Sequence, residues 1–375
     1  MALCNRLSGE AHKLCNTLHN HFFAPKRREE VSSQTYPRVA RPGLFRQVCM
    51  WVVLLLKLVT RHGQLLEFIS CVMIAVFCAW VRSYSRGWDA RAMAAFFVSV
   101  TVSALGAFAA VFNDNIPPVK RAADSGMVLG AHHNAFVALS AIKGVSVAAL
   151  FSAVFHLTLY IRLNDRKMLA PRRHLEMVYV VAVHYCVNWG VSAVLCVLGQ
   201  HDFQTSCVLT IGYLLWTHVF AMYTPNARQI ALDSFVLDRY PAQRPIRVMC
   251  SMSPARYFIE AFTLWDSVPD SGADKDSSGR AFMLNYFSYR EENLSTCLSI
   301  LFTFILSLIV IRWFVFEYLN STDFHSLYDT PLFAKFFGKL LIAIAFGMAI
   351  LITAHEEGIW GLAKQKKSKT EGHPR

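Results

Sequence analysis

The sequence predicts an all-α, polytopic membrane protein, because it combines long apolar runs, an apolar composition and charges gathered between the runs. Six or seven runs of membrane length fill residues 44–354. A helix needs roughly 20 consecutive apolar residues to cross the ~30 Å hydrocarbon layer, where a single segment satisfies its own backbone only as a helix. Hydrophobic residues make up 54% of the 375 residues, which is too apolar for an ordinary soluble domain.

The net charge of +12 does not indicate nucleic-acid binding, because much of the excess lies in the two tails. Eight Lys and Arg residues precede residue 48, and five follow residue 363. Basic segments beside membrane helices are attracted to anionic lipid. We therefore expect membrane lipids, and no nucleic acid, among the partners.

The ten cysteines do not predict a metal site, since no C-x-x-C pair occurs among them. Cys250 and Cys297 flank the longest polar loop. They could form a disulfide if that loop faces an oxidising compartment, although the reduced state is favoured.

The chain is expected to enter the membrane through an amphipathic elbow helix. Residues 1–43 form a polar basic tail that lacks the apolar core of a secretory signal. Residues 44–60 have an uncharged core too short to span, and Arg46 and Lys57 bracket that core. This pattern is typical of a helix that lies along the cytosolic interface.

Six crossings follow, and a seventh apolar segment is marginal. The crossings are predicted over residues 65–81, 92–112, 132–161, 177–198, 203–225 and 293–311. Residues 226–292 form a long polar excursion before the sixth crossing. The C-terminal extension, residues 319–375, contains the seventh segment, 336–354, and a basic tail. Residues 336–354 contain Lys339 and are only marginally long enough to span. A re-entrant or interfacial course is slightly favoured over a crossing, because a crossing would place Lys364, Lys366, Lys367 and Lys369 outside.

The orientation of the crossings is left open by the charges. A cytosolic N-terminus would place the loop after the third crossing outside. That loop and its flanks carry five basic residues, namely Arg162, Arg166, Lys167, Arg172 and Arg173. Basic loops favour the cytosolic side, so the two signals disagree.

Lys143 is the most conspicuous charge within an apolar run. An unpaired ammonium at the bilayer centre costs roughly 2.5 kcal/mol or more, so Lys143 should face a partner, a cavity or an end of the membrane. Glu67, at the entrance of the first crossing, is one candidate partner. Snorkelling of the lysine along a long helix that begins in the cytosol is at least as well supported as contact with a substrate. For His156, His184 and His218, each alone in its run, we expect interhelical hydrogen bonding.

Five short stretches follow one another along the chain: PGLFRQ at 42–47, PVKRAADSGM at 118–127, AIKG at 141–144, HYCVNWG at 184–190 and MSPARYFIEAF at 252–262. In this order they resemble the transmembrane half of the ABCG (White-type) ABC transporters, most closely the plant and protist branch. PGLFRQ at 42–47 resembles the start of the family's elbow helix, and PVKRAADSGM at 118–127 resembles its W-R-E-x-x-S-G-M loop. AIKG at 141–144 stands where the branch has I-K-P, and HYCVNWG at 184–190 is similar to Y-C-V-T-G. MSPARYFIEAF at 252–262 resembles S-P-x-R-W-x-x-E-A. The resemblance implies an ABC-2 type six-helix domain over residues 44–318.

The resemblance also implies a docking loop for an ATPase domain, within residues 113–130. Its matching positions are Lys120, Arg121, Ser125 and Gly126. This sequence has Ala122 where the family has Glu, and the missing carboxylate removes a charged partner for interdomain contacts. An ordinary basic cytosolic loop is an equal alternative from the residues alone.

Two further features follow from the resemblance. Two such domains would face each other about a two-fold axis, with the second and fifth helices lining the translocation path. Candidates for that lining are Phe97, Phe108, Leu215 and Val219, with ordinary packing as the alternative at each. Residues 252–262 would form a re-entrant helix, on which Arg256 and Glu260 can pair at i, i+4.

The sequence thus predicts the membrane-spanning subunit of an ABCG-like ABC transporter, which moves lipids, sterols or other amphiphiles across the plasma membrane or an intracellular membrane. The chain has no G-x-x-x-x-G-K-[ST] loop, so ATP would be bound by a partner chain, and we expect no cofactor, metal or catalytic site in this one. A second transmembrane domain, identical or different, is the other expected partner. The alternative is a non-transporting scaffold or regulatory protein, derived from a transporter that lost its ATPase domain.

Overall fold

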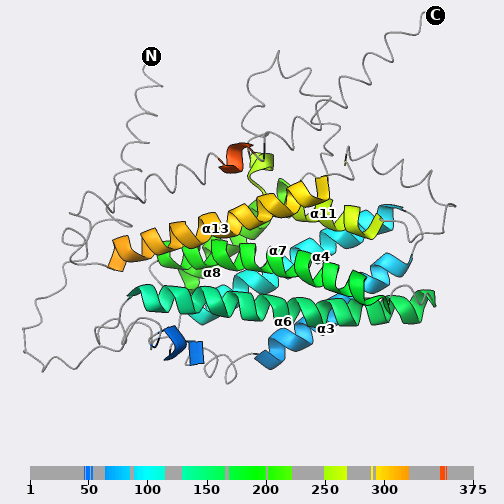
Figure 1. The fold of residues 1–375 in the computed structure, drawn as a ribbon, viewed down its shortest axis with the longest axis horizontal. Helices are drawn as coiled ribbons and strands as arrows, with labels where there is room; N and C mark the ends of the chain where they lie inside the picture. The colour runs from blue at the N-terminus through cyan, green and yellow to red at the C-terminus, as the bar shows by residue number, and fades with distance from the viewer. Residues whose placement is uncertain are drawn as a thin grey trace, which may run out of the picture.

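The computed structural model describes residues 46, 48–50, 52–53, 64–84, 88–114, 129–164, 169–199, 202–221, 249–267, 289, 293–320, 347–350 and 352. Within these ranges the protein is helical and contains no strand. Seven helices make up the bundle in Figure 1. They are α3 (Gln64–Tyr84), α4 (Trp88–Asp114), α6 (Leu129–Leu163), α7 (Pro171–Leu198), α8 (Phe203–Val219), α11 (Pro254–Ser267) and α13 (Asn293–Asn320).

The protein is an integral, multi-pass membrane protein. Five of the described helices are long and apolar enough to cross a bilayer, namely α3, α4, α6, α7 and α13. The prediction of an all-α polytopic protein is therefore confirmed at this level. Helix α8 has only 17 residues, which is short of the usual spanning length.

Several helix ends differ from the predicted crossings, and polar residues explain most of the differences. Helix α7 begins at Pro171, six residues before the predicted start, because a proline and an exposed Arg172–Glu176 pair can occupy a first helical turn outside the apolar layer. Helix α13 continues to Asn320, beyond the predicted end at residue 311. The fifth crossing, predicted over residues 203–225, was too long, since α8 ends at Val219 and a turn follows at Phe220.

The helices lie side by side along the long axis of the molecule (Figure 1). Helices α3 and α6 run parallel, as the first and third members of an up-and-down bundle must. The Sγ of Cys71 lies 3.7 Å from the carbonyl oxygen of Val147, and farther along both helices Arg162 Nε donates to Ser83 Oγ at 3.3 Å. Helices α4 and α7 likewise run parallel to each other.

Helix α7 is the centre of the bundle. It contacts α4, α6, α8, α11 and α13, and it is the most buried of the five candidate spans. Glycines allow two of these contacts to be close. A Cβ on Gly106 of α4 would lie 2.6 Å from the carbonyl oxygen of Tyr185, and one on Gly144 of α6 would lie 2.8 Å from Cys186 Sγ. Both helices therefore approach α7 more closely than side chains at these positions would permit.

Helix α11 is short and is enclosed by the other helices. Residues 254–265 are all buried, among α4, α7, α8 and α13. Its first residues lie beside the C-terminal part of α8, where Ser253 Oγ donates to the carbonyl oxygen of Thr217 at 2.6 Å. Its last turn reaches the end of α3. In Figure 1, α8 and α11 are labelled in opposite halves of the bundle, so these two short helices occupy different depths.

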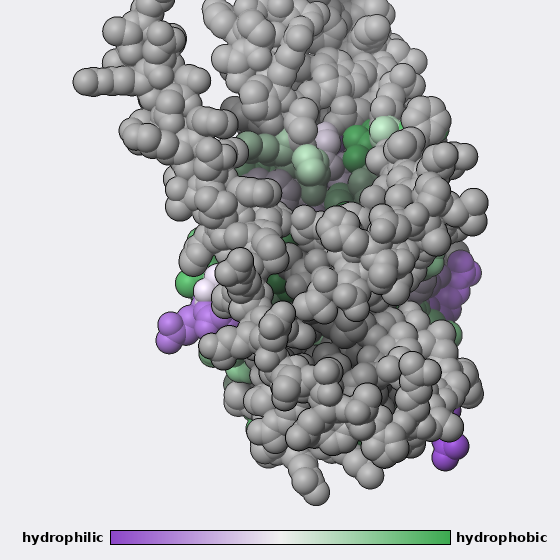
Figure 2. Space-filling view, turned by 90° about the vertical axis from the view of Figure 1, so that its left-hand side faces the viewer, coloured by the Kyte–Doolittle hydropathy of each residue, from purple (hydrophilic) through white to green (hydrophobic). Residues whose placement is uncertain are grey.

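The ends of the polypeptide are described only in fragments. In the predicted elbow, residues 46, 48–50 and 52–53 are helical; Val48 and Val52 pack against the core, while Met50 and Val53 are exposed. Of the seventh segment, only residues 347–350 and 352 are described as helical. Where described side chains are visible in Figure 2, they are mainly hydrophobic, and hydrophilic ones lie toward the margins of that view.

Candidate functional site

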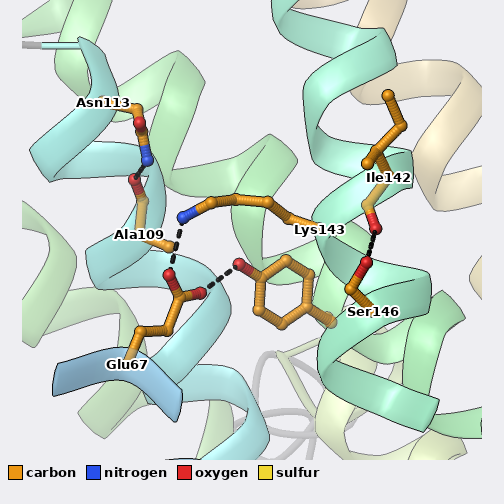
Figure 3. Close-up of polar contacts among 7 residues, drawn as sticks. Glu67, Ala109, Asn113, Ile142, Lys143 and Ser146 are labelled. Carbon is orange, nitrogen blue, oxygen red and sulfur yellow. Dashed lines mark hydrogen bonds and ion pairs between the residues drawn. The ribbon is translucent and has the colours of Figure 1, made fainter. Parts of the chain in front are cut away.

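The first buried polar group joins α3, α6 and α7. Lys143 Nζ lies 2.6 Å from Glu67 Oε2, and Tyr185 Oη donates to Glu67 Oε1 at 3.0 Å. Figure 3 shows the ammonium of Lys143 and the carboxylate of Glu67 directed toward each other. The two side chains are only 10% and 15% exposed, so the structure places the lysine against the carboxylate and not along the helix toward an end. The positive charge also lies 5.8 Å from the ring centroid of Trp189.

The Lys143–Glu67 pair has no net charge, which explains why a lysine and a glutamate can both be buried here. A buried charge is expensive in a membrane unless an opposite charge and hydrogen bonds accompany it. Glu67 receives both from Lys143 and Tyr185. The group therefore fixes the relative positions of three helices.

A second polar group lies between α4, α7 and α8. His184 is completely buried, and its Nε2 lies 2.8 Å from Ser103 Oγ and 3.3 Å from Ser99 Oγ. The same Ser99 hydroxyl lies 3.2 Å from Nε2 of His218. The His184 ring stacks on Phe258 of α11, with a centroid separation of 3.9 Å and an interplanar angle of 14°.

The polar group extends along α7 to Asn188. Its Nδ2 donates to the carbonyl oxygen of His184 at 2.8 Å, and its Oδ1 accepts from Tyr213 Oη of α8 at 2.9 Å. Side-chain amides and imidazoles with several partners rigidify a membrane bundle. The interhelical hydrogen bonding expected for His184 and His218 is thus present, with serine hydroxyls as partners.

The third polar group follows α11. Arg256 and Glu260 are both buried, and Glu260 Oε1 accepts from Asn293 Nδ2 of α13 at 3.0 Å. At the end of α11, Asp266 pairs with Arg82 of α3, and the distance from Arg82 Nε to Asp266 Oδ2 is 2.6 Å. Beside this end, on α6 and α7, Ser152 Oγ lies 3.2 Å from His156 Nδ1 and 2.8 Å from His174 Nδ1. A helix that carries as many charges as α11 does would be unstable in lipid, which explains the enclosure of α11.

The predicted path residues lie on α4 and α8, where they are half-buried or exposed. Phe97 and Phe108 are half-buried in α4, where Phe97 makes an edge contact with Phe77, at 5.5 Å between centroids. Leu215 and Val219 are 64% and 61% exposed on the outer side of α8. Any shared path would have to lie at the surface of this chain, against lipid or another subunit.

The docking loop, the disulfide and the absence of a metal site are the remaining points raised by the sequence. The docking loop, with Lys120, Arg121, Ser125 and Gly126, lies outside the described residues. Cys250 and Cys297 are both buried free thiols, so the disulfide considered from the sequence is not present. Among the described residues, no group of three or more His, Cys, Asp and Glu could hold a metal ion.

Sequence reasoning missed the contribution of Ser99, Ser103, Asn188 and Tyr213. Their spacing carried a signal, because Ser99 and Ser103 are four residues apart on α4, as His184 and Asn188 are on α7. That periodicity marks one polar face on each helix but does not reveal that the two faces meet.

Comparisons with known proteins add no identity. No protein-family model matches the chain, and no curated protein matches it.

Proposed function

We propose that this chain is the membrane-spanning subunit of an ABCG-like ABC transporter, which moves lipids, sterols or other amphiphiles when paired with an ATP-binding chain. In this proposal α8 is the fifth crossing and α13 the sixth, and α8 is short because the helix α11 occupies the rest of its depth in the bundle. The resemblance of five collinear stretches is the basis of the proposal, and the structure supplies supporting geometry.

The observation that carries the proposal is the enclosure of α11. The resemblance implies a re-entrant helix at residues 252–262, and α11 is a 14-residue helix buried between α8 and α13. Arg256 and Glu260 lie within it and are 6% and 1% exposed. A charged helix too short to span needs neighbours on all sides, and α11 has them.

A second transmembrane domain is the partner that fits the outer face of α8. That face is apolar and exposed along its length, through Val208, Ile211, Leu215 and Val219. Helix α8 also carries Gly212, beside which a Cβ would meet no atom within 4 Å. Apolar faces with a small residue are typical of close helix packing in membranes, and a two-fold pairing would place two copies of this face opposite each other.

The decisive experiment tests the ATPase partner. The tagged full-length chain is purified from its native membrane into nanodiscs, and bound chains are identified by mass spectrometry. We expect an ATP-binding-cassette chain, whose recovery decreases for Arg121→Ala and increases for Ala122→Glu, because the latter restores the missing carboxylate. Arg172→Ala is the matched control, since it removes an arginine whose side chain is 90% exposed and which lies outside residues 113–130.

Transport is then measured with the purified pair in vesicles that contain fluorescent phosphatidylcholine and sterol. The proposal expects ATP-dependent movement of either probe between leaflets. If no ATP-binding chain is recovered, or if the three variants behave alike and neither probe moves, the scaffold reading replaces the transporter.

A further inference from the structure

Three helices present polar faces to one line inside the bundle, which we call the polar column. Helix α4 contributes two hydroxyls, α7 contributes residues at four-residue spacing, and α8 contributes one side along its length. The polar column consists of Ser99, Ser103, His184, Asn188, Ser192, Ser206, Thr210, Tyr213, Thr217, His218 and Ser253. All are buried except Tyr213 and His218, which are half-buried. Polar side chains inside membrane helices are costly, and they commonly mark ion or proton pathways.

Ser99 is the central link of the polar column. Its Oγ lies 3.3 Å from Nε2 of His184 and 3.2 Å from Nε2 of His218, so one hydroxyl bridges two imidazoles. The Nδ1 of His218 lies 2.8 Å from the carbonyl oxygen of Leu214. A carbonyl can only accept, so Nδ1 carries the hydrogen and the Nε2 of neutral His218 is an acceptor that faces Ser99.

One side of the polar column contains hydroxyls that have no hydrogen-bond partner among the described residues. Ser192, Ser206 and Thr210 are fully buried, and none of their hydroxyls has a hydrogen-bond partner among the described residues. An unsatisfied buried hydroxyl costs about 1–3 kcal/mol, whereas a bound water would satisfy it. Together with Tyr213, these residues extend from the histidines toward Gly199, at the end of α7.

The other side of the polar column continues along α11. The Oγ atoms of Thr217 and Ser253 lie 3.2 Å apart. Beyond Ser253, buried polar residues recur every three or four positions on α11, as Arg256, Glu260 and Thr263. The Thr263 hydroxyl also lacks a partner among the described residues. The series ends at the Arg82–Asp266 pair.

We propose that the polar column is a water-binding proton path within a single chain, with Ser99 passing the proton between the two histidines. When Nε2 of His218 gains a proton, this N–H donates it to Ser99 Oγ while the Ser99 hydroxyl hydrogen transfers to Nε2 of His184. One N–H and one O–H bond break, and one O–H and one N–H bond form. Ser99 stays neutral, and the positive charge moves from His218 to His184.

Two contacts would reduce the cost of a transient positive charge on the buried His184. The face of Phe258 stacks on the imidazole, and a cation is attracted to such a face. Ser103 Oγ, at 2.8 Å from Nε2, can accept from the protonated ring. The elements packed around the two histidines carry other ionisable groups, among them Tyr185 on α7, Tyr213 on α8, and Arg256, Tyr257, Glu260 and Asp266 on α11. This path needs no ATPase partner, so its test is independent of the test of the proposed function.

The test uses the full-length chain in vesicles that hold a pH-sensitive dye, with an acid bath outside and with potassium and valinomycin to balance charge. We expect faster acidification than in protein-free vesicles, loss of the protein-dependent rate in Ser99→Ala, and its retention in Ser99→Thr, which keeps the hydroxyl. Ser146→Ala is the matched control, because the Ser146 hydroxyl donates to the carbonyl oxygen of Ile142, outside the polar column (Figure 3).

A second variant keeps the test decisive if Ser99→Ala does not fold. His218→Phe removes the Nε2 that Ser99 contacts and places another aromatic ring at this half-buried position. It too should lose the protein-dependent rate. Acidification no faster than in protein-free vesicles, or equal rates for wild type and the folded variants, overturns the proposal.

Discussion

Arg82 and Asp266 are 184 residues apart in the chain and form a two-pronged ion pair. Arg82 Nε lies 2.6 Å from Asp266 Oδ2, and Nη2 lies 3.4 Å from Oδ1. Both side chains are less than 10% exposed. The pair links the last turn of the enclosed α11 to the end of α3.

Removal of one partner from this pair should destabilise the protein strongly. Asp266→Ala leaves the Arg82 guanidinium buried and without its carboxylate, at a cost of about 3–5 kcal/mol. The matched control is Arg172→Ala, whose pair with Glu176 is exposed and worth about 0.5 kcal/mol at most. Unfolding of the detergent-solubilised chain by a denaturing detergent measures both. Equal losses for the two variants would contradict the burial argument.

The Lys143–Glu67 pair should show the same asymmetry inside the apolar layer. Lys143→Met leaves Glu67 with Tyr185 but no cation, so we expect a loss of roughly 2.5 kcal/mol or more. The double variant Lys143→Met, Glu67→Met should recover part of that loss, because neither charge is then buried alone.

Tyr185→Phe is the comparison for this pair. It removes a single hydrogen bond to Glu67 and should cost only about 0.6 kcal/mol, as interhelical hydrogen bonds in membranes average. The same unfolding assay separates these cases. A double variant as unstable as the sum of both single variants would show that the charges do not act as a pair.

A methyl group at Gly106 should push α4 away from α7. Its Cβ would lie 2.6 Å from the carbonyl oxygen of Tyr185, and a backbone atom cannot move aside as a flexible side chain can. We expect Gly106→Ala to cost about 1–3 kcal/mol. Gly347→Ala is the control, since Gly347 is helical, no atom lies within 4 Å of its Cβ, and alanine favours a helix by up to about 1 kcal/mol. Thermal unfolding of both variants in detergent tests the contrast.

The start of α8 should be sensitive to acid through Asp202. Hydrogen bonds from the Thr205 hydroxyl and backbone N–H hold the pKa of the Asp202 carboxyl below its ordinary value. The distance from Thr205 N to Asp202 Oδ2 is 2.8 Å. Because the folded-state pKa is lowered, the cap stabilises the helix above the unfolded-state value of about 3.9, and this contribution is lost as the pH falls below about 4.

Asp202→Asn keeps a capping side chain without a titrating group, so it should lose less stability than the wild type between about pH 6 and pH 3. Asp202→Ala lacks the cap at every pH and should be the less stable protein at neutral pH. Melting temperatures across that pH range measure the difference. Parallel pH profiles for the wild type and Asp202→Asn would contradict the assigned role.

The sequence by itself determined that this is an all-α membrane protein and where most of its helices lie. Hydrophobic length is a property of each segment alone, because a helix in lipid satisfies its own backbone and needs about 20 apolar residues whatever its neighbours are. It predicted the helix ends less well. Apolarity marks the membrane-embedded part, while α7 and α13 continue into polar residues that still form helical turns.

Only the tertiary structure decided how the polar residues are paired. The spacing of Ser99, His184 and His218 gives each a place on its own helix, but a contact across 85 or 119 residues depends on which faces meet and at what depth. That depth is set by packing: Gly106 and Gly144 let α4 and α6 approach α7, and α11 fills the half of the bundle that the short α8 leaves. Hydropathy depends on the transfer of each segment into lipid by itself. The polar column depends instead on the depth at which neighbouring helices are packed against one another.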